Sequence, residues 1–201
     1  MKLWPLIVLT VACVMAPAAS ANSTYTWNFA TTPNASLGST THTYTLGGID
    51  ITATGSTNLY YKVGGGDETG LGLACCDSDR EINPRQSIVL NLSGLFSKNV
   101  TSLTLMLGSI QSGEFGSVCD AFAKCMTFDS SSDFTPVSIM SLYSDMKAHH
   151  SGQLIVTGGP GDVLINQLQA TTSAVPEPSS LLLMGSGLLA MAGVVRRKLR
   201  V

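Results

Sequence analysis

Short runs of β-favouring residues recur through the middle of the sequence, and residues that form turns separate them. This middle part of the sequence has no long stretch with the 3.6-residue periodicity of an amphipathic helix. The predicted strands are residues 25–30, 41–46, 49–54, 59–63, 87–92, 102–107, 137–143, 153–157 and 163–169. The sequence therefore predicts an all-β fold, with an antiparallel, jelly-roll-like β-sandwich domain over residues 22–169 and a short polar linker over 170–174.

Alternation within the runs predicts which side chains face the core. Ile88, Leu90 and Leu92 share one side of a strand, and residues 102–107 alternate in the same way. The chain contains no G-x-S-x-G motif, phosphate-binding loop or H-E-x-x-H motif, so the common hydrolase and nucleotide-binding signatures are missing. We therefore expect the protein not to be an enzyme.

The N-terminus has the organisation of a secretory signal peptide. Lys2 precedes the apolar residues 3–14, and Ala19-Ser20-Ala21 places small residues where signal peptidase cleaves. We expect residues 1–21 to be removed before Asn22. The alternative is lipidation at Cys13, because residues 10–13 weakly resemble a lipoprotein box.

The C-terminus, residues 175–201, has three parts in a fixed order. A Pro-Glu-Pro segment comes first, and an uncharged run, residues 179–195, follows it. As a helix this run is roughly 25 Å long, close to the lower limit for crossing a bilayer. A basic cluster, residues 196–200, then resists translocation and stays cytoplasmic. We expect a transmembrane helix with everything before it outside the cytoplasm. The alternative is a plain C-terminal anchor with a rigid proline spacer.

These three parts together resemble the PEP-CTERM sorting signal of Gram-negative bacteria that make exopolysaccharide. The matching box is Val175, Pro176, Glu177 and Pro178, and the basic end is Arg196, Arg197, Lys198 and Arg200. The resemblance implies that an exosortase, a membrane enzyme, recognises and cleaves the tail. It also implies a precursor anchored in the inner membrane with its domain in the periplasm, which is then released to the cell surface or extracellular matrix.

The exported part of the chain is acidic. Residues 22–175 hold 6 of the 11 basic and 12 of the 13 acidic residues, which gives about −6 against −2 for the whole chain. Such a charge repels nucleic acid and anionic lipid, and it suits neutral glycans or cations. We therefore expect no nucleic-acid partner.

Four of the five cysteines lie in this exported part. An even number of cysteines in an exported domain indicates disulfides. A bridge between the neighbours Cys75 and Cys76 requires a strained eight-membered ring, so we predict two bridges that join this pair to Cys119 and Cys125. The alternative is a zinc site with four thiolate ligands, although the spacing does not match the usual C-x-x-C pattern.

Acidic residues are concentrated in residues 64–84, and several of them alternate along the chain. Calcium prefers such clusters of oxygen ligands. We predict a calcium site whose candidate ligands are Asp67, Asp77, Asp79 and Glu81. The alternative is a solvated acidic loop whose side chains cap its own turns.

The same stretch resembles a pattern in exported domains of the PEP-CTERM class. In that pattern G-L-G precedes D-x-E-I and an alternating strand; here the residues are 70–72, 79–82 and 88–92. The resemblance implies a β-sandwich.

Two weaker patterns bear on glycans. Glu81 and Glu114 form a glycosidase pair only if the fold brings them to roughly 5–10 Å. Tyr60 and Tyr61 are neighbours, so one of them faces away from the core and can stack on a sugar. The predicted function is therefore a structural, exopolysaccharide-associated surface protein. The alternatives are a calcium-dependent glycan-binding module and a secreted glycan hydrolase.

Overall fold

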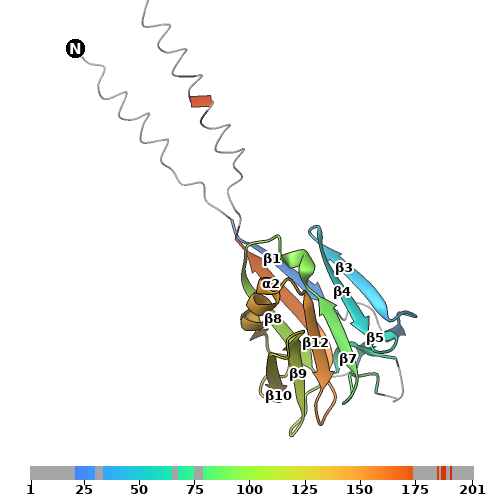
Figure 1. Cartoon of the computed structure of the whole chain (residues 1–201). Coiled ribbons are helices and arrows are strands. Elements are labelled where there is room, and N and C mark those ends of the chain that lie inside the picture. Colours follow the sequence, from blue (N-terminus) through green and yellow to red (C-terminus); the bar gives the residue numbers. More distant parts are fainter. Residues whose placement is uncertain are drawn as a thin grey trace, which may run out of the picture. The chain divides into compact units, whose positions relative to one another are not determined.

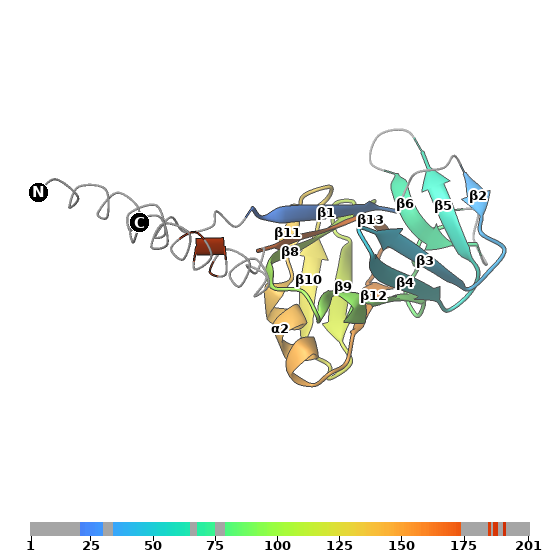
Figure 2. The ribbon, with the colours of Figure 1, turned by 90° about the horizontal axis from the view of Figure 1, so that it is seen from above.

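The computed structural model describes residues 21–29, 34–64, 68–74 and 79–173, together with residues 185, 187, 188 and 191. Ser23–Thr172 form one compact unit. Its strands pair in antiparallel fashion to build one sheet of seven strands and one of six. Figures 1 and 2 show the two sheets from two directions.

The seven-stranded sheet contains the longest strands of the domain. In spatial order its strands are β11 (Val137–Ser138), β8 (Val100–Gly108), β13 (Leu164–Thr172), β6 (Thr69–Leu73), β5 (Leu59–Val63) and β2 (Ala35–Ser36). Strand β1 (Ser23–Asn28) lies beside β13 on the same side as β6. β13 pairs with β6 at Ile165 and with β1 from Gln167 to Thr172, so two strands share one edge.

The six-stranded sheet has a simple linear order. Its strands are β10 (Cys125–Asp129), β9 (Phe115–Asp120), β12 (Gln153–Gly158), β7 (Ser87–Asn91), β4 (Ile49–Gly55) and β3 (Thr41–Leu46). In both views of the domain, β3 and β4 lie on the side away from α2 (Figures 1 and 2).

The connections from β6 to β13 identify the topology. The chain passes between the sheets at each step except the β9–β10 hairpin, and the orders are β11-β8-β13-β6 and β10-β9-β12-β7. Two sheets of four strands with these connections form a jelly roll. The predicted all-β sandwich is therefore confirmed. Strands β1, β2 and β5 widen one of its sheets, and β3 and β4 widen the other.

The core lies between the two sheets. Leu105 and Leu168 reach it from the seven-stranded sheet, and Ile51, Leu90 and Val156 reach it from the six-stranded sheet. All five are fully buried. Ile88 and Leu92 are fully buried as well, so the predicted inward face is correct. Burial of this much apolar surface is the main favourable term in folding.

One predicted strand, residues 137–143, is wrong. β11 covers only Val137–Ser138, and the helix α2 (Met140–Ala148) begins two residues later. The buried residues Leu142, Tyr143 and Met146 lie on one face of this helix, whereas a strand would point the neighbours Leu142 and Tyr143 to opposite sides. A short 3-10 helix, η2 (Ser93–Leu95), lies near α2, and Tyr143 donates a hydrogen bond to the Leu95 carbonyl at 2.9 Å.

The predicted linker is also partly wrong. β13 continues to Thr172, and Ala170 is fully buried between Tyr25 of β1 and Leu103 of β8. Residues 170–172 therefore belong to the sheet. Strands β2, β6, β9 and β10 were not predicted, because their glycine, serine and cysteine residues are also typical of loops.

Residues 1–20 of the predicted signal peptide lie outside the described residues. Most of the C-terminal segment, residues 175–201, lies outside them as well. Residues 185, 187, 188 and 191 are helical. Among the described residues there is no helix with the length and hydrophobicity to cross a membrane.

Candidate functional site

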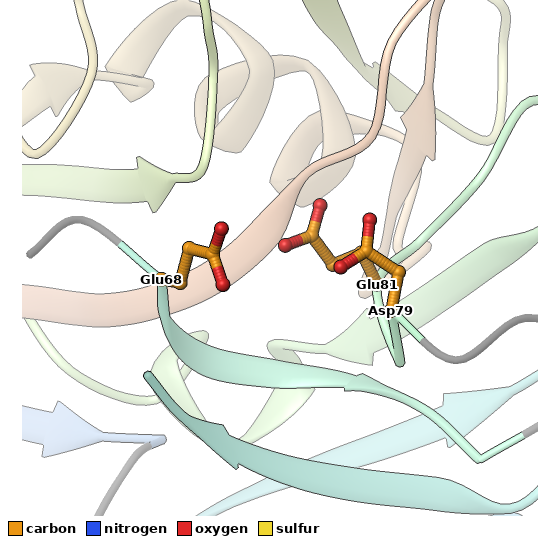
Figure 3. A group of neighbouring side chains, drawn as sticks. All are labelled: Glu68, Asp79 and Glu81. Carbon is orange, nitrogen blue, oxygen red and sulfur yellow. The ribbon is translucent and has the colours of Figure 1, made fainter. Parts of the chain in front are cut away.

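Three carboxylates come together at one end of the β5–β6 hairpin. Glu68 precedes β6, and Asp79 and Glu81 lie in the segment that leads from β6 to β7. One oxygen from each carboxylate lies within 4.8 Å of the others. Figure 3 shows the carboxylates of Asp79 and Glu81 facing that of Glu68.

Lys62, on β5, contacts all three carboxylates. Its Nζ lies 2.6 Å from Glu81 Oε1, 2.9 Å from Asp79 Oδ1 and 3.0 Å from Glu68 Oε2. Lys62 is 9% exposed and Glu81 is 3% exposed, whereas the other two carboxylates reach solvent. Lys62 and these three carboxylates form the Lys62 site. It is a buried ammonium–carboxylate pair with two further carboxylates at its solvent side.

Ser109 completes the buried end of this site. Its Oγ donates a hydrogen bond to Glu81 Oε1 at 2.7 Å, and the residue is 3% exposed. Ser109 has a φ of 67°, in the left-handed region that serine rarely adopts. Residues from β5, from the β6–β7 connection and from the end of β8 thus meet at one carboxylate.

The pKa values of Lys62 and Glu81 reflect this environment. Burial acts to lower the pKa of Lys62, but hydrogen bonds to Glu81, Asp79 and Glu68 outweigh it, so the pKa lies above the ordinary 10.5. Burial raises the pKa of Glu81, while hydrogen bonds from Lys62 and Ser109 act to lower it. Lys62 therefore keeps its proton at neutral pH.

Two glycines of β6 allow β13 and the segment that carries Asp79 and Glu81 to approach β6 closely. A Cβ at Gly70 would lie 2.7 Å from the Ile165 carbonyl oxygen, and one at Gly72 would lie 2.0 Å from the Arg80 carbonyl oxygen. Arg80 lies between Asp79 and Glu81, so Gly72 lets the acidic segment pack directly on β6. This packing gives a physical reason for the G-L-G and D-x-E-I segments: the glycines position the acids.

The structure bears on the predicted calcium ligands only in part. Asp79 and Glu81 come together as predicted, with Glu68 as a third carboxylate that the predicted set did not contain. Asp67 and Asp77 lie outside the described residues. The Lys62 ammonium lies among the three carboxylates, so a metal ion there must compete with it. One positive charge against three negative charges still leaves the site favourable to cations.

The predicted disulfide pairing is wrong. Cys119 is bonded to Cys125, not to Cys75 or Cys76, which lie outside the described residues. The two cysteines occupy directly opposite positions on β9 and β10, with Cα atoms 4.1 Å apart. Neither strand was predicted, so the closeness of this pair across a hairpin could not be recognised from the spacing.

The two tyrosines of β5 differ from each other less than we predicted. Tyr61 is 8% exposed and donates a hydrogen bond from its hydroxyl to that of Tyr44. Tyr60 is half-buried, and the Arg80 guanidinium lies 5.4 Å from its ring centroid. Both side chains are therefore engaged within the protein.

Comparison with known proteins identifies the tail. Residues 174–198 match the family model of the PEP-CTERM protein-sorting motif. The match contains Val175–Pro178 and the first three residues of the basic cluster, all of which lie outside the described residues. No curated protein and no solved structure matches the chain. The motif indicates an exported protein that is sorted by an exosortase.

Proposed function

We propose that this chain is a structural, non-enzymatic protein of the cell surface or extracellular matrix, associated with exopolysaccharide. In this proposal, signal peptidase removes residues 1–21, and residues 179–195 hold the precursor in the inner membrane with its domain in the periplasm. An exosortase then processes the tail. The sorting motif at residues 174–198 is the observation that carries the proposal.

The arrangement of the domain supports a structural role. Glu81 is the most buried carboxylate of the Lys62 site, and it bonds to Lys62 and Ser109. A general acid or base needs access to a substrate proton. Glu81 instead joins three segments of the sandwich, which suits a domain whose task is to remain folded outside the cell.

The location of the mature protein tests this proposal. We expect the protein in the extracellular polysaccharide of the producing strain, where it co-elutes with polymer on size exclusion and separates from it after the polymer is degraded. The same fraction should release no reducing ends from the polymer beyond those of a strain lacking the protein. Recovery of the mature protein free of polymer, or hydrolysis that depends on it, would contradict the proposal.

A second candidate is a calcium-dependent glycan-binding module, and the three carboxylates around Lys62 favour it. Calcium at 100 times its dissociation constant would stabilise the fold by about 2.7 kcal/mol. We therefore expect the melting temperature of the full chain in detergent to rise by several degrees with calcium relative to chelator. Asp79→Asn should remove the shift. An unchanged melting temperature in the wild type would show that Lys62 alone balances these carboxylates.

A further inference from the structure

The side chains on the outer face of the six-stranded sheet are arranged in regular rows. Along β4, β7 and β12, the residues Ile51, Leu90 and Val156 point into the core and are fully buried. Side chains at alternate positions of these strands therefore point away from the core. Because the register of all six strands is continuous, these outward side chains form rows that cross the sheet.

The middle row crosses the whole sheet and has an apolar centre. In order from β3 to β10 its residues are Thr41, Thr54, Val89, Ile155, Cys119 and Cys125. Val89 and Ile155 are half-buried, and the Cys119–Cys125 bridge continues the apolar surface to the edge strand. Six strands at a spacing of about 4.8 Å make this row about 24 Å long.

Polar, uncharged side chains flank the middle row on both sides. On one side lie Thr43, Thr52, Asn91 and Gln153. On the other side lie Ser87, Thr157, Ser117 and Thr127. Hydroxyl and amide groups of this kind both donate and accept hydrogen bonds.

None of the side chains in the three rows is charged, although residues 22–175 have a net charge of about −6. A sugar ring has an apolar face of C–H groups and an edge of hydroxyl groups. A polymer of such rings lying along the middle row would place its apolar faces on Val89, Ile155 and the disulfide. Its hydroxyl groups would then meet the flanking rows. An acidic polymer would gain no ion pairs on this face and would be repelled by the rest of the domain.

The outer face of the seven-stranded sheet differs in this respect. The corresponding row there joins Thr104 of β8, Gln169 of β13 and Thr26 of β1, and it has no apolar centre. Polar groups bond to one another on both faces, as Gln169 does with the Thr26 hydroxyl here and Thr43 with Thr52 on the six-stranded sheet, so the missing apolar centre is the difference. This face of the same domain therefore serves as an internal control.

We propose that the outer face of the six-stranded sheet is a binding surface for an uncharged polysaccharide, which lies across the strands along the middle row. The inference rests on the proposed association with exopolysaccharide and adds the surface and the charge class of the polymer.

The test uses the extracellular polysaccharide of the producing strain, separated by anion exchange into unretained neutral and retained acidic fractions. Binding of the full chain in detergent to each immobilised fraction is measured by biolayer interferometry. We expect binding to the neutral fraction that persists at high salt. Ile155→Glu should weaken it by about tenfold or more, because it places a charge at the centre of the contact.

Two further variants make the result specific. Thr127→Glu lies on the exposed edge strand β10, where folding tolerates the change, and it should also weaken binding. Met106→Glu makes the matched apolar-to-acidic change on a half-buried residue of β8, in the other sheet, and should bind as the wild type does.

Each contrary outcome has a distinct meaning. If the wild type binds the neutral fraction and both Ile155→Glu and Thr127→Glu bind equally well, the surface is wrong but the association with polysaccharide stands. Binding of the wild type to the acidic fraction alone would also overturn the proposed surface for an uncharged polymer, while the association with polysaccharide would stand. Loss of self-association in the variants, without a change in glycan binding, would assign the face to a contact between copies. Binding of the wild type to neither fraction would contradict the proposed function itself.

Discussion

The C-terminal segment and the β-sandwich domain present functional information in different ways. The sorting motif is a linear order of box, apolar run and basic cluster within residues 174–198. The Lys62 site instead joins residues from β5, the β6–β7 connection and the end of β8. A linear motif can be recognised without folding the chain. A site of the second kind can be recognised only after the strand pairing is known.

Changes to the C-terminal segment should have the largest effect on the processing and location of the protein. Glu177→Ala, and a separate variant with Arg196, Arg197 and Lys198 made neutral, should leave unprocessed or misplaced protein in the membrane. Both changes lie outside Ser23–Thr172 in the sequence, so we expect the melting temperature of the domain not to move. Cell fractionation followed by immunoblotting measures the outcome. Normal maturation of both variants would show that the tail is not read as a sorting signal.

Removal of the Lys62 ammonium should have the largest effect on the stability of the domain. Lys62→Met leaves Glu81 buried without its charged partner, which costs about 3–5 kcal/mol. Urea unfolding of the processed chain, followed by the fluorescence of the buried Trp27, measures the loss.

Glu68→Gln is the matched control. The Glu68 side chain is 40% exposed, so its ion pair with Lys62 is screened by solvent and should contribute less than about 1 kcal/mol. Equal losses in Lys62→Met and Glu68→Gln would mean that the buried pair is not the centre of the network.

Loss of the disulfide should have a smaller effect. Cys119 and Cys125 are separated by 6 residues in sequence, and closure of so short a loop stabilises the fold by about 2 kcal/mol in the chain-entropy model. Cys119→Ser combined with Cys125→Ser should lower the free energy of unfolding by that amount. Peptide mapping without reduction should find both cysteines in one linked peptide. A link from either cysteine to Cys75 or Cys76 would contradict the structure.

The smallest expected effect is a difference in pH dependence. The pKa of Lys62 is raised above its unfolded value of 10.5. The folded state therefore binds the Lys62 proton more tightly, and the resulting stability is complete below pH 10.5 and is lost as the pH rises above it. The stability difference between wild type and Lys62→Met should be constant at neutral pH and should shrink in that alkaline range. A constant difference throughout would exclude an ionised pair.

Alternation predicted much of the sandwich because β-strands with one buried face impose a period of two. The bounds of β3 and β5 agree with the prediction, and the core positions Ile88 and Leu90 are buried. β6 was not predicted because Gly70 and Gly72 resemble turn residues, whereas they serve close packing on β13 and Arg80. Local composition cannot distinguish a glycine that turns the chain from one that lets two segments approach.

The candidate site was predicted less completely than the fold. Asp79 and Glu81 were predicted because acidic residues are dense in that stretch. Lys62 lies just before the stretch, on β5, and its role there depends on how β5 packs. A lone lysine in a strand usually reaches solvent, and nothing in its neighbours indicates burial. Ser109 offered no signal either, since its role depends on a left-handed turn after β8. The roles of Lys62 and Ser109 could be recognised only once the strand pairing was known.

The C-terminus of the mature protein tests the central claim most directly. Intact mass spectrometry should be applied to protein recovered from the extracellular matrix of the wild-type strain and from the membranes of a strain lacking exosortase. We predict a chain that ends near Val175–Pro178 in the wild type, and one that retains its apolar run and basic cluster in the deletion strain. A chain that retains the basic cluster in the wild-type matrix, or that is shortened equally in both strains, would contradict sorting by exosortase.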